Sequence, residues 1–514
     1  MFRHVMRSIP LAVLLSLSAA TARAQDPAPV PSSLAPAPAA APTAAPTPAP
    51  ATAPTTAPDV ASPTAPDVTS PTPHAPIEAK KLDTGKFEFG SYGRVRIATD
   101  GRGGTGRQAN VVSHGSRIDE ESYAELELRR EDTYSDTIRT RIVTTLALFP
   151  PFFHFSGNPQ QQIAIRNLYA QGTYENYTLW AGSRMYRGDD IYLLDWWPLD
   201  NQNTLGGGLG GKWGDTSVAL HVGEQRLDNP YQYEQIPVVA PFGFGSVNVT
   251  YLDRPRFVET LKVTQLLRTA GSRGSSPGGF KIVGYGEVHE ISAGSFRDTT
   301  TNQDHALPND SGFLLGAELA YWTGERDTFV QLFAKHARGV AAYDPLAAPL
   351  TFANDRTTSG STETMVAVGG NWESGMFGVL AGGYLRFFRD GSPSPTSTQK
   401  YDEGIVVVRP QLYIGEHWGV ALEGSYQQRR LGILDPATDA PLTASALRGG
   451  IIPYFSPSGR GSYKRPQLRL LYSVTARDTG ARALYPHEDA FAQRRVEHFV
   501  GLGAEWWFNS SSYP

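Results

Sequence analysis

The spacing between candidate strands constrains this chain more than any single strand does. From about Phe87 onward, short stretches of alternating polar and apolar residues are separated by turn signals. Tight turns alternate with long connections along this region. The tight turns are Glu175-Asn176, Gly214-Asp215, Thr323-Gly324-Glu325 and Gly415-Glu416, and the long connections are 98–120, 187–205, 224–256, 291–311, 337–362, 428–444 and 475–495. Short turns at one rim and long loops at the other are typical of an outer-membrane β-barrel.

The alternating stretches number 18, and bacterial single-chain barrels have an even number of strands. They lie at 87–97, 121–131, 137–147, 163–174, 177–186, 206–212, 216–223, 257–267, 280–290, 312–322, 326–336, 363–371, 377–387, 403–413, 417–427, 445–454, 464–474 and 496–508. We therefore predict an all-β fold, an 18-stranded antiparallel transmembrane β-barrel over residues 86–508. A short C-terminal tail follows at 509–514.

The first 24 residues have the three parts of a secretory signal peptide. Arg3 and Arg7 precede the apolar run Leu11–Leu17, and Ala22-Arg23-Ala24 supplies a small-x-small cleavage site. We predict a signal peptide over 1–24 and export by the Sec route. Together with the barrel pattern, this predicts the outer membrane of a Gram-negative bacterium as the location of the protein.

Residues 25–85 are predicted to be a linker. Up to about Pro76 this segment is nearly all Pro, Ala and Thr, and it has no apolar periodicity that could bury a core. We expect an extended, disordered periplasmic spacer. Two roles stay open: a passive linker, which the composition favours, or an arm that touches peptidoglycan or a periplasmic partner.

Two stretches near the start of the predicted barrel each have one face that would contact water, which we call the wet face. In 92–97 and 123–128, apolar side chains lie on one side and aromatic or charged side chains on the other. Aromatic rings can stack on the apolar faces of sugars, and charged side chains exchange hydrogen bonds with sugar hydroxyls. We therefore predict a water-filled lumen that conducts sugars. The wet face carries Tyr92, Arg94, Arg96, Tyr123, Glu125 and Glu127, and the last stretch adds Glu505 and Trp507.

The composition argues against several other classes of protein. Cysteine is absent, so neither a disulfide framework nor a cysteine-based metal site can form. The formal net charge of −4, without a basic block, argues against a nucleic-acid partner. No Ser/His/Asp set and no metal-ligand spacing is assignable, so we expect no enzymatic activity, no metal and no cofactor.

Three stretches of the chain have a more specific pattern. They are Phe89-Gly90-Ser91-Tyr92-Gly93-Arg94, Tyr123-Ala124-Glu125-Leu126, and the region from Arg166 through Trp180-Ala181-Gly182-Ser183-Arg184 to Gly206-Gly207-Gly208. Together they resemble strands one, two, four and five and the third loop of the maltoporin family, over roughly 86–508. The family consists of trimeric carbohydrate porins with 18-stranded barrels, whose third loop folds inward and narrows the channel. The resemblance implies a homotrimer in outer-membrane lipid that passes malto-oligosaccharides or related sugars by passive diffusion.

The resemblance also implies two sets of sugar-binding residues. An aromatic slide would consist of Tyr92, Tyr123, Tyr463 and Trp507, and a polar track of Arg94, Arg117, Glu125, Arg166, Asp190, Asp195 and Trp197. Two positions depart from the family. A track arginine is replaced by Gly188, next to Arg187, and the second-loop tryptophan has no match, with Phe155 as the nearest aromatic residue.

Two alternatives to a sugar channel remain. One is a general or anion-tolerant porin in which the aromatic residues are structural. The other is a different class of protein, a barrel enzyme or an adhesin displayed by a barrel. An enzyme would need a nucleophile and base at the rim, and an adhesin would need a loop long enough to fold alone, and neither is evident in the sequence.

Overall fold

The computed structural model describes residues 85–150, 162–240, 243, 245–269, 278–298, 301–323, 327–435 and 438–510. The predicted signal peptide over 1–24, residues 25–84 of the predicted linker, Phe155 and residues 511–514 of the predicted tail lie outside the described residues. Within the described ranges, no helix has both the length and the apolar character needed to cross a membrane.

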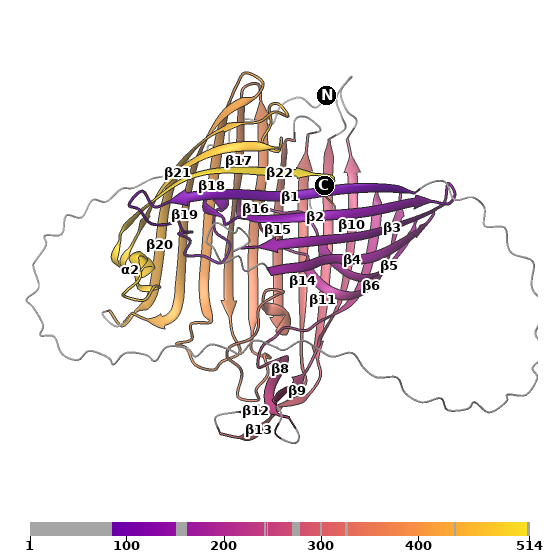
Figure 1. Ribbon diagram of the computed structural model, residues 1–514, viewed down its shortest axis with the longest axis vertical. Coiled ribbons are helices and arrows are strands. Elements are labelled where there is room, and N and C mark those ends of the chain that lie inside the picture. The colour runs from indigo at the N-terminus through magenta and orange to yellow at the C-terminus, as the bar shows by residue number, and fades with distance from the viewer. Residues whose placement is uncertain are drawn as a thin grey trace, which may run out of the picture. The chain divides into compact units, whose positions relative to one another are not determined.

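Eighteen strands form one closed antiparallel sheet, which confirms the predicted barrel (Figure 1). Each strand pairs with the next one along the barrel, and β22 closes onto β1 with Trp507 opposite Tyr92. The barrel strands are β1 (Lys86–Thr99), β2 (Tyr123–Thr133), β3 (Ile138–Phe149), β4 (Gln162–Tyr174), β5 (Tyr177–Arg187), β6 (Asn201–Trp213), β7 (Thr216–Gln225), β10 (Arg256–Arg268), β11 (Gly279–Ile291), β14 (Asp310–Trp322), β15 (Phe329–Gly339), β16 (Thr362–Ser374), β17 (Phe377–Arg389), β18 (Lys400–Ile414), β19 (Trp418–Leu434), β20 (Pro441–Phe455), β21 (Gln467–Arg477) and β22 (Val496–Phe508).

The alternation in the sequence becomes a difference between the two faces of the sheet. In β2, Leu126 and Leu128 point outward and are exposed, whereas Glu125 and Glu127 point inward and are buried. Leu470 and Leu502 repeat the outward pattern on the last two strands. Successive side chains of a strand point to opposite faces, so each strand offers one apolar face to lipid and one polar face to the lumen.

Two of the long connections carry hairpins that the sequence did not predict. The first hairpin is β8 (Tyr233–Val239) with β9 (Ser246–Asp253), and the second is β12 (Gly294–Asp298) with β13 (Gln303–Leu307). They gather beyond the same end of the barrel in Figure 1. They lie within the long connections 224–256 and 291–311, to which the sequence assigned no strand.

The predicted connection over 428–444 is largely strand. β19 runs on to Leu434 and β20 begins at Pro441, which leaves only residues 435–440 between them. In this region Gln427 and Leu431 are buried while Gln428 is exposed, so the alternation continues. Both faces of the two strands are rich in polar residues here. The alternation of polar and apolar residues that indicates a strand is therefore not visible in the sequence.

Three connecting segments fold into the barrel and occupy part of the lumen. We call them loop 1 (100–122), loop 3 (188–200) and the inward turn (456–466), which joins β20 to β21. Loop 3 contributes much of the apolar core, together with side chains from β11 and β14 to β19. The short helices of the connections are the 3-10 turns Arg117–Asp119, Tyr192–Leu194 and Val340–Ala342 and the α-helices α1 (Thr479–Ala483) and α2 (Ala490–Gln493).

Candidate functional site

Loop 3 is fixed to the barrel wall by close packing at Ile191. The inward positions that face this side chain are Gly369 of β16 and Gly382 of β17. A Cβ added there would lie 3.2 and 2.7 Å from Ile191. The Ile191 N–H donates to the carbonyl of Trp196 at 2.8 Å, which closes the tip of the loop. The small residues of the wall therefore create the space into which loop 3 inserts.

Loop 1 packs on loop 3 and bonds to distant strands. Trp196 of loop 3 stacks on His114 of loop 1, with ring centroids 4.3 Å apart. Asp119 pairs with Arg448 of β20 at 2.9 Å, and both side chains are buried. Charge-assisted hydrogen bonds are strong where water is excluded. Loop 1 therefore has a fixed position against the lumen wall.

Aromatic side chains form one continuous set of ring contacts, which we call the aromatic run. Tyr123 lies 6.0 Å from Tyr92, and Tyr92 stacks on Trp507 at 6.5 Å, measured between ring centroids. Tyr192 of loop 3 continues the run, 6.1 Å from Trp507 and 5.5 Å from Tyr463. All four residues of the predicted slide therefore belong to one run, and Tyr192 joins its two parts.

Several rings of the aromatic run are covered by other side chains. Tyr92 has an exposed fraction of 0% and Tyr123 of 9%, whereas Tyr463 and Trp507 are half-buried. Arg117 donates a hydrogen bond to the Tyr92 hydroxyl at 2.8 Å. A sugar in the lumen would therefore meet Tyr463 and Trp507 first, and it would reach Tyr92 only after neighbouring side chains move.

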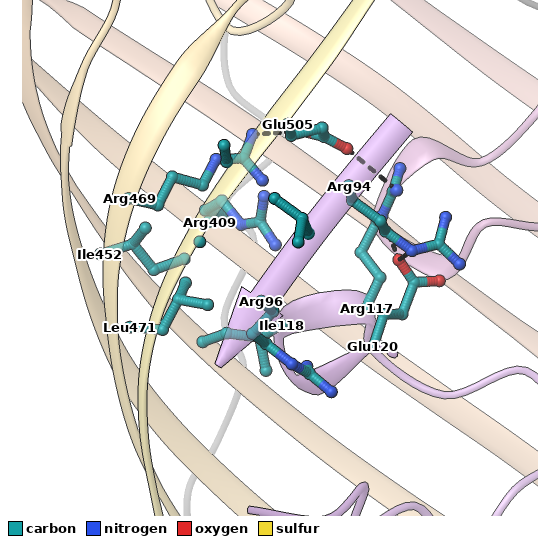
Figure 2. Close-up of a pocket in the computed structure, with 13 residues that line it drawn as sticks. Arg94, Arg96, Arg117, Ile118, Glu120, Arg409, Ile452, Arg469, Leu471 and Glu505 are labelled. Carbon is teal, nitrogen blue, oxygen red and sulfur yellow. Dashed lines mark hydrogen bonds and ion pairs between the residues drawn. The ribbon is translucent and has the colours of Figure 1, made fainter. Parts of the chain in front are cut away.

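Glu505 of β22 connects both loops to the inward turn. It pairs with Arg117 of loop 1 at 3.0 Å, Arg465 of the inward turn at 2.8 Å and Arg469 of β21 at 2.5 Å. It also accepts a hydrogen bond from the hydroxyl of Tyr192 at 2.8 Å. Figure 2 shows Glu505 linked to Arg469 on one side and to Arg117 on the other. This buried cluster, the Glu505 cluster, fixes the relative positions of the three inward segments.

The predicted polar track is divided between two groups of ion pairs, and in one of them Glu120 of loop 1 pairs with both Arg94 and Arg117, at 3.4 and 2.9 Å. Arg94 of β1 pairs with Asp195 of loop 3 at 3.4 Å. Arg166 of β4 pairs with Glu125 of β2 and also donates to the hydroxyl of Tyr123. Arg117, the third predicted arginine, belongs to the Glu505 cluster. These charged groups already have partners, so a sugar hydroxyl would exchange with existing bonds.

Two track residues of loop 3 have different surroundings. Trp197 lies under Arg187, with the guanidinium carbon 3.6 Å from the ring centroid. Asp190 takes part in none of the ion pairs within 4 Å that join described residues. Burial and the nearby carboxylate of Asp195 raise the pKa of Asp190 to about 6. The Asp190 carboxyl therefore changes from neutral to negatively charged as the pH rises through about 6.

Gly188 is held against Asp200, in the position where the resemblance implies an arginine. Its N–H donates to the Asp200 carbonyl at 3.3 Å, and an added Cβ would lie 2.0 Å from a carboxylate oxygen of Asp200. A side chain would fit at position 188 only if Asp200 moved. The adjacent Arg187 instead donates to the side chain of Asn201 at 2.8 Å.

Sequence analysis did not assign Tyr192 or Arg465 to the site. Each contacts Glu505, from 313 and 40 positions away along the chain. The sequence offered one clue to their role, which is their position near predicted site residues. Tyr192 lies between the predicted track residues Asp190 and Asp195, and Arg465 follows Tyr463 by two residues. Neither position reveals these contacts, because Tyr192 reaches Glu505 from loop 3 and Arg465 reaches it from the chain just before the neighbouring strand β21.

Comparisons with known proteins find a family model and solved structures that match most of the chain. The model of the LamB porin family matches residues 87–508. Similar solved structures include DcaP, an outer membrane channel of Acinetobacter baumannii, at 10% identity and a TM-score of 0.44, covering 85% of this chain and 100% of that chain. The trimer form of OmpT of Vibrio cholerae has 12% identity, a TM-score of 0.40, and coverages of 83% and 100%. Pseudomonas aeruginosa OpdK with vanillate has 10% identity, a TM-score of 0.39, and coverages of 83% and 99%. No curated protein sequence matches.

Proposed function

Because this chain belongs to the LamB porin family, we propose that it is a sugar channel within that outer-membrane class. Sugars, malto-oligosaccharides or related compounds, diffuse passively through the lumen along the aromatic run and past the paired charges beside it. The gradient of the sugar is the only driving force. The channel selects by weak and repeated contacts, because a permeant bound tightly at one site would not leave it.

The continuous aromatic run is the observation that carries this proposal. Ring-to-ring spacings of 5.5 to 6.5 Å join Tyr123 to Tyr463 through Tyr192. A chain of apolar faces lets a pyranose ring move from one contact to the next without full rehydration. The adjacent ion pairs of Arg94 and Arg166 supply donors and acceptors for the hydroxyls.

The test is block of single-channel current by sugars in a planar bilayer. The double variant Tyr92→Ala/Tyr123→Ala should bind maltodextrin at least about fivefold more weakly, because each of the two lost ring contacts is worth about 0.5–1.5 kcal/mol. Its ion conductance should stay similar or rise. The matched control is Tyr177→Ala/Trp213→Ala, which removes an outward-facing ring pair of β5 and β6 whose centroids are 5.8 Å apart. If maltodextrin blocks the current of a well-folded double variant as strongly as that of the wild type, the aromatic slide is refuted.

A general or anion-tolerant porin is the second candidate, and one observation favours it. Tyr92 has no exposed surface, and Glu125 is buried beside Arg166. If the wild-type current is unaffected by both maltodextrin and sucrose, the aromatic run is structural and this second candidate holds. Liposome swelling with a panel of sugars gives an independent measure of the same difference.

The proposal extends to location and assembly. The signal peptide over 1–24 directs export, and the linker over 25–85 lies in the periplasm as a passive spacer or as an arm on peptidoglycan. Outward side chains such as Leu209 and Leu447 are exposed on the described barrel. They contact lipid or a neighbouring copy in a homotrimer. Chemical cross-linking in detergent measures the number of copies.

A further inference from the structure

A second polar site lies in the lumen beside loop 3, and its lining includes no residue of the aromatic run. It is a cavity of about 470 Å³ formed by β3 to β5, β7, β10 and the start of loop 3. Small-molecule sites occupy ~300–1,000 Å³, so this volume is large enough for a sugar residue. Gly188 and Asp189 of loop 3 form one edge of the cavity, and Tyr169 and Tyr186 lie on the barrel side.

The lining of this cavity is cationic. Arg141, Arg184, Arg187 and Lys262 line it, with Asp189 as the one carboxylate among the lining residues. Most of these charges have partners. Arg141 pairs with Glu131 at 2.7 Å, Lys262 pairs with Asp200, and Asp189 pairs with Lys281.

Arg184 differs from the other cations of the lining. Its guanidinium carbon lies 5.0 Å from the ring centroid of Tyr169, 5.2 Å from Trp180 and 5.8 Å from Tyr186. It bonds weakly to the amide oxygen of Gln171 at 3.4 Å. In the described part of the chain, none of the ion pairs within 4 Å involves Arg184. Its charge is therefore held in place by rings and lacks a neutralising carboxylate.

The rings that hold Arg184 are themselves ordered. His221 of β7 is stacked between Trp180 and Tyr186, with interplanar angles of 12° and 10°. Trp180 is buried, and Tyr186 is half-buried at the cavity. A rigid stack costs little entropy when a ligand binds, because its side chains are already immobile.

We propose that this cavity is a subsite for anionic sugars, in which Arg184 pairs with a carboxylate or phosphate and Tyr186 contacts the sugar ring. The inference deepens the proposed function, because it names the class of sugar that the same lumen favours. An anionic group would form a charge-assisted bond with the guanidinium, which neutral sugars cannot offer. The carboxylate Asp189 is neutralised by Lys281, so it does not repel the ligand.

The test compares glucose, glucuronate and glucose 6-phosphate as blockers of single-channel current at 0.1 M KCl. For the wild-type channel, we expect at least one anionic sugar to bind about tenfold more tightly than glucose. Arg184→Gln should reduce this ratio to about one and leave glucose binding unchanged within about twofold. Arg184→Lys, which keeps the charge, should retain part of the preference. Whichever of glucuronate and glucose 6-phosphate binds more tightly shows whether the subsite favours carboxylated or phosphorylated sugars.

The matched control is Arg139→Gln. Arg139 lies on the same face of β3 as Arg141, two positions away, and does not line the cavity. An equal loss of preference in Arg139→Gln and Arg184→Gln would mean a general electrostatic field and would overturn the subsite. An unchanged preference in Arg184→Gln would also overturn it. If maltodextrin does not block the current, the aromatic slide of the proposed function is refuted and the subsite is not. Block by an anionic sugar that depends on Arg184 supports the subsite whether or not maltodextrin blocks the current.

Discussion

The lumen has two unlike walls, and their difference shows where a permeant can pass. On the covered wall, β14 to β19, loops 1 and 3 pack against buried apolar side chains such as Leu314, Phe333 and Met365. On the open wall, β3 to β5 with β7 and β10, a polar cavity remains beside loop 3 and carries four cationic side chains. The covered wall therefore acts as a support that positions the loops, and the permeant contacts the opposite side of loop 3.

The largest expected effect comes from the Glu505 cluster, which anchors the loops of the covered wall. Replacing Glu505 by Gln leaves three buried guanidinium groups without their shared carboxylate. Removing one partner of a buried ion pair costs about 3–5 kcal/mol. We expect the free energy of unfolding in detergent to fall by that amount, measured by thermal or denaturant unfolding.

The control for this prediction is Glu131→Gln on β2, next to the open wall. Glu131 is partly exposed and pairs with Arg141 at 2.7 Å and Arg129 at 3.3 Å. Exposed pairs contribute about 0–1 kcal/mol, because water screens them. Equal losses of stability in Glu505→Gln and Glu131→Gln would show that the Glu505 cluster holds the inward loops no more firmly than an exposed ion pair would.

The second prediction moves loop 3 away from the covered wall. A side chain at Gly382 would contact Ile191, so Gly382→Val should push the tip of loop 3 away from the covered wall and narrow the passage on its other side. We expect single-channel conductance to fall by about twofold and stability to fall by about 1–3 kcal/mol, the usual cost of overpacking. Gly424→Val is the control, because a Cβ added there meets no atom within 4 Å. Unchanged conductance in Gly382→Val would place the constriction elsewhere.

The third prediction concerns Tyr192, which connects the covered wall to the aromatic run. Tyr192→Ala removes a ring between Trp507 and Tyr463, so sugar block should weaken about two- to tenfold. Tyr192→Phe keeps the ring and removes only the hydroxyl that donates to Glu505. We expect Tyr192→Phe to retain sugar block, measured in the same bilayer experiment. Equal weakening in both variants would assign the effect to the Glu505 cluster and not to stacking.

The fold was predictable from the sequence because the strand period repeats in every membrane-crossing segment. The wet face of Tyr92 and Tyr123 also followed from local alternation. Contacts made by the inward loops did not, because they join distant positions such as Ile191 and Gly382. The same reason applies to the cavity, where Arg184 and Lys262 come from β5 and β10 and share no local motif. The local alternation of residues therefore predicts which side chains line the lumen. Tertiary packing of the loops decides which part of that lining stays uncovered.

The smallest expected effect is a change of ion selectivity with pH. Burial raises the pKa of Asp190 from its ordinary value of 3.8 to about 6, so this carboxyl is mostly neutral at pH 5 and charged at pH 7. The lumen beside loop 3 therefore gains one negative charge as the pH rises. We expect the ratio of cation to anion permeability to increase between pH 5 and 7, measured by the reversal potential across a KCl gradient.

Asp190→Asn should flatten this pH dependence, and Asp215→Asn should not, because Asp215 is an exposed residue that pairs with Arg268 at 2.9 Å in a turn. A raised pKa also means that the folded protein holds a proton that the unfolded chain has lost. Between pH 4 and 6 the contribution of Asp190 to stability therefore falls as the pH rises. If the selectivity change persists in Asp190→Asn, another group titrates in this range and the charge of Asp190 does not control the passage.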